Sequence, residues 1–169
     1  MEKTTNTQKP SQEVNSSIDV SVQVDNFDHA SLYQNLAALK PTPGAVVTFT
    51  GLVRDLSSVG DVSGIFLEHY PGMTENSLIA IAKQAQQRWP IDKIIIVHRV
   101  GKIASDEQIV FVGTASKHRK EAFLACEFIM DYLKNDAPFW KKELTDDGSF
   151  WVEAKDSDSQ AKQRWENKN

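Results

Sequence analysis

Cysteine and long apolar runs are scarce in this sequence. Cys126 is the single cysteine among 169 residues, so no internal disulfide can form and no cysteine pair has the spacing of a zinc site. No apolar run approaches the roughly 18 residues that a membrane-spanning helix needs, and residues 1 to 17 lack the apolar segment of a secretory signal. We therefore expect a cytoplasmic protein that does not enter a membrane.

Excess basic charge and glycine-rich phosphate loops are also absent. The chain has 19 Lys and Arg against 23 Asp and Glu, a net charge of -4, whereas nucleic-acid binders normally present a basic face. Neither GxGxxG nor GxxxxGK followed by Ser or Thr occurs, which removes the commonest nucleotide-binding sites. No pair among the 4 histidines has metal-ligand spacing, so we expect no metal and no other cofactor.

The composition is sufficient for one hydrophobic core. Hydrophobic residues make up 40% of the chain, which at this length favours a single domain with tails. Residues 1–17 are too polar to offset the entropy of ordering and predict a disordered tail. We expect the domain over 18–155 and a polar, fraying tail over 156–169.

Hydrophobic periodicity predicts an α+β fold. The irregular mixture of elements, which ends in a hairpin, fits this class better than a doubly wound sheet. In the helix that ends near Lys134, Phe123, Cys126, Met130 and Leu133 form the expected core stripe. Strands are expected over 18–24, 45–55, 65–71, 93–100, 107–115, 139–144 and 149–154, and helices over about 30–39, from N-cap Thr74 to Trp89, and from N-cap Ser116 to Lys134.

Four cations stand out because they lie where predicted elements end, at the places where a scaffold presents functional groups. They are Arg54, Arg119, Lys134 and Lys141. A guanidinium suits phosphate because its donors form a planar fork. Taken singly, each cation is better explained structurally: Lys134 by the negative end of its helix, for example, and Lys141 by packing along an aromatic ring. Spacing alone does not identify a site.

Three other residue types could carry chemistry. His118 stands at a helix N-terminus, where a site role and a surface position are equally supported. Cys126 lies on the apolar stripe, which favours inert packing over nucleophilic chemistry. Glu68 and Glu143 could act as acids or bases, although salt-bridge roles are favoured.

Five long segments, in one order, resemble the large, catalytic subunit of the molybdopterin synthase family. The likeness extends from about Gly44 to Trp165. The segments are "GAVVTFTGLVRD", "LEHYPGMTENSL", "RWPIDKIIIVHRVGKI", "IVFVGTASKHRKEAF" and "FIMDYLKNDAPFWKKE".

The resemblance implies an α/β hammerhead fold with an additional β-rich subdomain. It implies a sulfurtransferase that converts cyclic pyranopterin monophosphate to molybdopterin by forming a dithiolene. The expected sulfur donor is the C-terminal Gly-Gly thiocarboxylate of a small ubiquitin-like subunit, whose tail inserts into the large subunit. The expected assembly is a heterotetramer around a homodimer of the large subunit.

The resemblance also implies roles for individual residues. It places catalytic lysines at Lys134 and Lys141, within "DYLKNDAPFWKKE". The substrate-binding residues that it implies are Leu52, Val53, Arg54, His118, Arg119, Lys134, Lys141, Lys142 and Glu143, with Phe49 and Met130 lining the pocket. Lys155 occupies a position where a pocket role is also compatible with the family.

Positive charge at these positions suits the implied chemistry. The cyclic phosphate and the thiocarboxylate are both anionic, so cations are needed to bring them together. Two other classes remain as alternatives: a module that binds a ubiquitin-like tail without chemistry, and a nucleic-acid-binding α+β domain. Both lysines are present, which counts against the first, and the acidic balance counts against the second.

Overall fold

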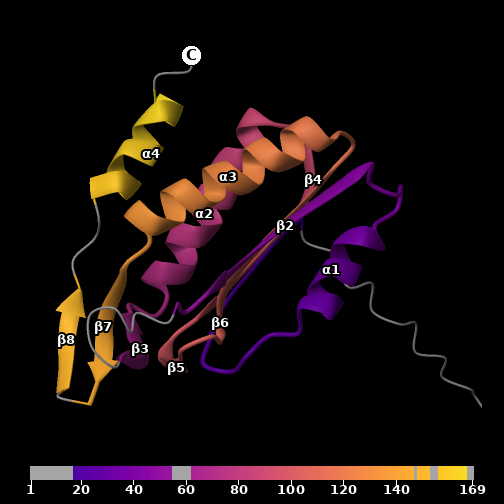
Figure 1. Ribbon diagram of the computed structural model, residues 1–169. Coiled ribbons are helices and arrows are strands. Elements are labelled where there is room, and N and C mark those ends of the chain that lie inside the picture. Colours follow the sequence, from indigo (N-terminus) through magenta and orange to yellow (C-terminus); the bar gives the residue numbers. More distant parts are fainter. Residues whose placement is uncertain (1–16, 55–61, 147, 153–155, 167–169) are drawn as a thin grey trace, which may run out of the picture.

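The computed structural model describes residues 17–54, 62–146, 148–152 and 156–166. These residues form two four-stranded sheets and four helices (Figure 1), which confirms the expected α+β class. The expected disordered tail falls almost entirely outside the described residues, as do Asp55 and Lys155.

The main sheet has the strand order β1-β4-β6-β2. Its strands are β1 (Ile18–Gln23), β4 (Ile91–Arg99), β6 (Gln108–Ser116) and β2 (Ala45–Leu52). β1 runs parallel to β4, whereas β4 and β2 each pair antiparallel with β6. The central strands β4 and β6 are buried along nearly their whole length, which explains their continuous apolar sequences.

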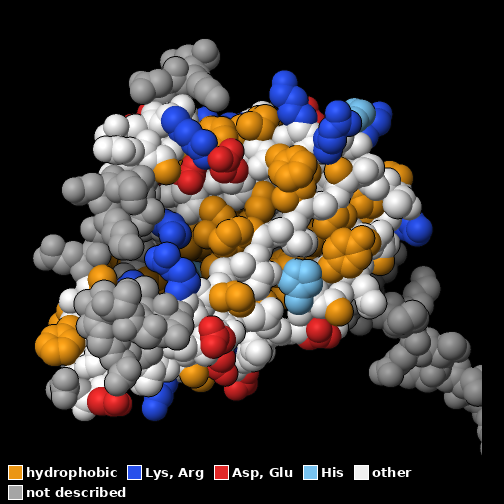
Figure 2. Space-filling view, in the orientation of Figure 1, with side chains coloured by type: hydrophobic (Ala, Val, Ile, Leu, Met, Phe, Trp, Pro, Cys, Tyr) orange, Lys and Arg blue, Asp and Glu red, His pale blue; other side chains and the backbone are white. Residues whose placement is uncertain are grey.

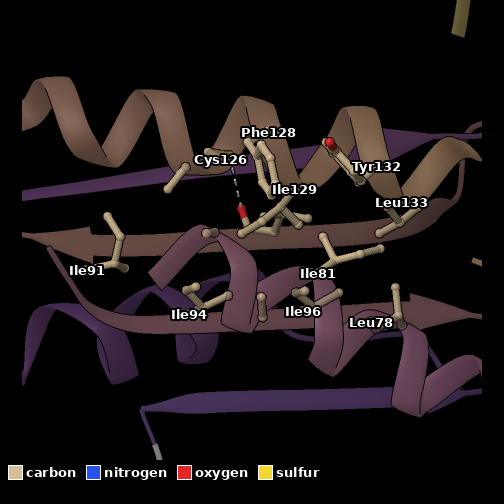
Figure 3. Close-up of a cluster of buried hydrophobic side chains, with 14 of the residues drawn as sticks. Leu78, Ile81, Ile91, Ile94, Ile96, Cys126, Phe128, Ile129, Tyr132 and Leu133 are labelled. Carbon is tan, nitrogen blue, oxygen red and sulfur yellow. Dashed lines mark hydrogen bonds between the residues drawn. The ribbon is translucent and has the colours of Figure 1, made fainter. Parts of the chain in front are cut away.

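Helices cover both faces of this sheet. α2 (Met73–Arg88) and α3 (Arg119–Asp136) lie on one face, and α1 (His29–Ala37) lies on the other (Figure 1). Isoleucines of β4 meet Leu78 and Ile81 of α2 and Phe128 and Ile129 of α3 in the larger core cluster (Figure 3). The smaller cluster under α1 includes Leu36 and Phe111.

The second sheet is the additional β-rich part. It has the order β5-β3-β7-β8, with every pair antiparallel. Its strands are β5 (Gly101–Ala104), β3 (Val62–His69), β7 (Phe139–Thr145) and β8 (Gly148–Val152). β5 is absent from the sequence-based expectation because four residues are too few to show a period-2 pattern.

Two of the predicted helix caps are wrong. α2 begins after Gly72, whose φ of 82° favours glycine, and the Gly72 N–H donates to Glu75 Oε2 at 2.6 Å. Thr74 is instead buried and donates its hydroxyl to the carbonyl of Pro138 at 3.2 Å. α3 begins after His118, and the Ser116 hydroxyl donates to the carbonyl of Pro90 at 2.8 Å while accepting from the His118 N–H at 3.5 Å, ahead of the helix. Tertiary hydrogen bonds therefore use both predicted capping groups.

The expected core stripe of α3 is wrong at its first position. Phe123 is 61% exposed. The buried face of the helix is Ala122, Ala125, Cys126, Phe128, Ile129, Tyr132 and Leu133. Two neighbouring faces of this helix both carry apolar residues three and four positions apart, so the spacing alone does not decide between them. The buried face is the one with the small residues Ala122 and Ala125, which allow the helix to approach the sheet.

The polar C-terminal segment is helical, contrary to the expected fraying tail. α4 (Asp156–Glu166) packs on α3, and Trp165 is only 3% exposed. The Trp165 indole N–H donates to Asp131 Oδ2 at 2.7 Å, and its ring makes an edge contact with Phe128 at 5.5 Å. Arg164 donates to Asp131 at 2.6 Å. One buried aromatic ring and a set of charged contacts therefore hold an otherwise polar helix on α3.

Trp165→Ala should destabilise the protein by about 3–5 kcal/mol, because it leaves a large cavity beside Phe128. Urea unfolding at constant pH measures this loss. Phe150→Ala is the matched control, since Phe150 is 61% exposed and its removal should change the unfolding free energy by less than about 0.5 kcal/mol. Equal effects of the two substitutions would contradict the docking of α4.

Candidate active site

A pocket of about 490 Å³ lies where the two sheets meet the C-terminal end of α3. β2 and the residues directly after it form one wall, and α3, β7 and β3 supply the others. Figure 2 shows Lys and Arg side chains gathered in this region beside hydrophobic ones. The residues that line it are Phe49, Thr50, Gly51, Leu52, Val53, Arg54, Ile65, His98, Ile109, Val110, Met130, Leu133, Lys134 and Lys141.

Three cations converge on the pocket. Lys134 comes from the last turn of α3 and Lys141 from β7, and Pro138 lies between them in the sequence. α3 ends at Asp136, and Ala137 has an extended backbone, so the chain leaves the helix directly into β7. Arg54 follows β2, where hydrogen bonds between Val53 and the 106–107 turn anchor the chain. No Asp or Glu of the described residues lines the pocket, so it is suited to an anionic ligand.

The rest of the lining is mainly apolar. Val53, Ile65 and Leu133 are buried, and Met130 is partly buried. Gly51 lies opposite Val110, and a Cβ there would come within 2.7 Å of Val110 Cγ1. Glycine therefore allows β2 and β6 to pack closely at this wall. Apolar walls lower the local dielectric, which strengthens the action of the three cations on a bound anion.

His98 is a pocket residue that the sequence-based selection missed. It lies near the end of β4, is 6% exposed and stacks on Phe139 with ring centroids 4.0 Å apart. Burial lowers the pKa of His98 to about 4, so the ring is neutral near pH 7. Its place in an apolar strand gives no indication of a site, because a buried structural histidine has the same sequence context.

The predicted site residues do not all meet. His118 and Arg119 lie at the N-terminal end of α3, in a separate hollow with Lys117, Lys120 and Glu121. Arg119 and Lys134 are fifteen positions apart on one helix, which corresponds to about 22 Å along its axis. These two groups cannot contact one small ligand within a single protomer.

Lys142 and Glu143 do not line the pocket either. The Lys142 ammonium lies 4.1 Å from the ring centroid of Trp151 and 3.9 Å from Glu68 Oε1. Successive strand residues point to opposite faces, so Lys141 and Lys142 cannot both face the pocket. Glu143 pairs with Ile65 and Phe150 in the second sheet.

Cys126 is packed in the core. It is 5% exposed, and its thiol donates to the carbonyl of Val112 at 3.9 Å, the dashed line in Figure 3. Burial raises the pKa of the Cys126 thiol to about 12, and nearby Glu127 adds to the shift. The reactive thiolate is therefore scarce at neutral pH, as expected for a structural cysteine.

Iodoacetamide should label Cys126 far more slowly in the folded protein than in guanidinium, because both thiolate formation and access are suppressed. Mass spectrometry after timed quenching at pH 8 measures the two rates. Labelling of the folded protein at the unfolded rate would contradict the buried, protonated thiol.

His98 should make stability depend on pH. The folded-state pKa of about 4 lies below the ordinary value of 6.5, so the unfolded chain binds more protons between these values and stability falls as pH decreases through this window. Between pH 7 and pH 4, wild type should lose about 3 kcal/mol more unfolding free energy than His98→Phe, which cannot titrate. Urea titrations of both proteins at the two pH values test this. Equal losses would show that the imidazole is not neutral and buried.

No group of three or more His, Cys, Asp or Glu side chains in the described ranges is arranged to hold a metal ion. None of the described helices combines the length and apolar character needed to cross a membrane.

The fold and pocket together define an α+β protein whose apolar-walled pocket combines Arg, Lys and a neutral His and is suited to an anionic ligand. The family model described as "MoaE protein" matches residues 22–136. The chain belongs to this family.

Proteins named "Molybdopterin synthase catalytic subunit" are close in sequence. The one from Vibrio cholerae is 56% identical over 147 residues, which cover 87% of this chain and 97% of that protein. The one from Pseudomonas aeruginosa is 53% identical over 147 residues, 87% and 98% of the two chains. The solved structure of molybdopterin cofactor biosynthesis protein E from Burkholderia multivorans has 48% identity and a TM-score of 0.77, and covers 91% of this chain and 100% of that one.

Proposed function

We propose that this chain is the catalytic subunit of a molybdopterin synthase, a sulfur-transferring enzyme of molybdenum cofactor biosynthesis. The observation that carries the proposal is the convergence of Arg54, Lys134 and Lys141 on one apolar-walled pocket. The names of the close relatives support the same activity. The substrate is cyclic pyranopterin monophosphate, and the product is its dithiolene.

The charges of the reactants explain the three cations. The substrate carries a cyclic phosphate and the sulfur donor is a thiocarboxylate, so the two anions repel each other unless the pocket supplies positive charge. Arg54 suits the phosphate because its guanidinium can donate two parallel hydrogen bonds. The site thus lowers the energy of bringing both anions together.

The two lysines divide the chemistry. Lys134, at the end of α3, stabilises the negative charge that develops as the sulfur attacks, and Lys141 transfers a proton. Each donor tail carries one sulfur, so one product molecule requires two donor encounters through a half-sulfurated intermediate. The same two ammonium groups serve both transfers.

The sulfur donor is a small ubiquitin-like subunit with a C-terminal Gly-Gly thiocarboxylate. The word "subunit" in the names of the relatives implies that their enzyme contains another chain. The rim of the pocket supports a protein partner, because Phe49 is 40% exposed and Leu52 is 56% exposed beside it. Phe123 on α3 is a further exposed aromatic residue, with 61% of its surface accessible. Exposed apolar areas of this kind are typical of protein interfaces.

His118 and Arg119 act in the neighbouring protomer of a homodimer at the centre of a heterotetramer. Their distance along α3 from Lys134 supports this assignment, because they cannot reach the same small substrate within one chain. Contacts of Lys142 and Glu143 with substrate stay predictions, as does a cytoplasmic location.

The tail-binding module without chemistry is the second candidate, and the site disfavours it. A module that only grips a peptide tail does not need Arg54, Lys134 and Lys141 together in one pocket. Single-turnover conversion separates the two functions, since a binding module forms the complex but no dithiolene.

Lys134→Ala and Lys141→Ala should each retain the fold and lower single-turnover conversion about 100- to 1000-fold, the usual cost of removing one group that stabilises the transition state. The assay mixes the protein with thiocarboxylated small subunit and cyclic pyranopterin monophosphate. Lys102→Ala is the control, because Lys102 is exposed on β5 and away from the pocket. A fully active lysine variant removes that lysine from the mechanism, and a wild-type complex without product supports the binding module.

A further inference from the structure

His98 is the pocket residue to which the proposed chemistry assigns no role. It lies on β4 in register with Val110 of β6, which itself pairs with Gly51 of β2. The His98 side chain therefore shares the face of the main sheet that α3 covers and lines the pocket with Lys134 and Lys141. The ring is 6% exposed, so its contact with solvent is limited to what the cavity allows.

The surrounding structure fixes which ring nitrogen carries the proton. Nδ1 lies 2.8 Å from the carbonyl oxygen of Arg99. A carbonyl oxygen only accepts, so Nδ1 must be protonated and donate. Neutral imidazole carries one proton, which leaves Nε2 as a hydrogen-bond acceptor. No side chain or backbone group in the described part of the chain donates to Nε2.

Packing fixes the orientation of this acceptor as well. The His98 ring stacks on Phe139 with a centroid distance of 4.0 Å and an interplanar angle of 22°. Phe139 is the first residue of β7, two positions before Lys141. The strand that supplies a proposed catalytic lysine therefore also holds the imidazole in place, so the position of Nε2 is set before a ligand binds.

The hydrogen-bonding character of His98 differs from that of the other polar side chains of the pocket. Arg54, Lys134 and Lys141 can only donate. Apart from the Thr50 hydroxyl, His98 supplies the single side-chain nitrogen or oxygen acceptor among the described lining residues. Because Nε2 lies on the cavity wall and no described group of the chain donates to it, this acceptor is available to a donor that enters the cavity.

We propose that His98 Nε2 accepts a hydrogen bond from an N–H or O–H group of the substrate heterocycle, while the cations bind its phosphate. This assignment rests on the proposed function. It divides recognition between charge, which any phosphorylated ligand satisfies, and a neutral acceptor, which only a ligand with a donor at that position satisfies. The pocket then discriminates against plain organophosphates of similar charge.

Three substitutions separate the acceptor from the packing of the ring. His98→Phe keeps the ring on Phe139 and removes both nitrogens. His98→Asn keeps an N–H for the Arg99 carbonyl and removes the acceptor at the Nε2 position. His98→Gln restores an oxygen acceptor close to that position. Urea unfolding at pH 7 establishes that each variant is folded before its kinetics are compared.

The measurement is steady-state conversion of cyclic pyranopterin monophosphate by the complete complex, with saturating thiocarboxylated small subunit. His98→Phe and His98→Asn should raise KM about tenfold with kcat nearly unchanged, because one neutral hydrogen bond is lost from ground state and transition state alike. His98→Gln should recover most of the wild-type KM. A purely structural role of the ring would not produce this order, since Phe preserves the stacking better than Gln does.

Three other outcomes would each contradict part of the proposal. Unchanged KM in the folded Phe and Asn variants overturns the acceptor role and leaves the proposed function intact. A fall in kcat with unchanged KM also overturns it, because His98 would then act on a catalytic lysine and not on bound substrate. No conversion by the wild-type complex overturns the proposed function and this inference together.

Discussion

The packing of α3 on the main sheet is the interaction on which the rest of the structure depends. Ala125, Cys126 and Ile129 bury one face of the helix against the sheet. The C-terminal end of the helix then presents Lys134 to the pocket, and the chain that leaves it becomes β7 of the second sheet. Because the interior is close-packed, the placement of α3 on the main sheet sets both where the second sheet begins and the shape of the pocket between the two sheets.

This arrangement lets the protein keep like charges close together. Arg54, Lys134 and Lys141 approach the pocket from three separate elements, each held by its own packing or backbone hydrogen bonds. Mutual repulsion among cations is an unfavourable term that the buried core and the helix C-terminus must offset. A bound anion is attracted to each of the cations and outweighs their repulsion, so charge that costs stability in the free protein contributes to binding.

The parts of the fold that follow from local patterns are predictable, and those that depend on distant partners are not. The apolar runs of β4 and β6 are visible in the sequence because strands buried on both faces are hydrophobic throughout. β5 and α4 are not visible in the sequence, because β5 is too short for a pattern and α4 has a single buried aromatic residue, Trp165, in an otherwise polar segment whose ion pairs are with distant residues such as Asp131. The predicted Thr74 cap is wrong because Thr74 lies inside α2, where its hydroxyl accepts from the Tyr70 N–H and donates to a carbonyl that is 64 positions away in the sequence.

The sequence by itself determined the types of the longer elements, and its resemblance to a known family supplied the cations expected at a site. Only the tertiary structure decided that Arg54, Lys134 and Lys141 share one pocket, that His98 joins them, and that His118 and Arg119 lie at the far end of α3. Periodicity is a local property, set by residues within one or two turns. Which side chains meet depends instead on strand register and chain reversal between residues far apart in sequence.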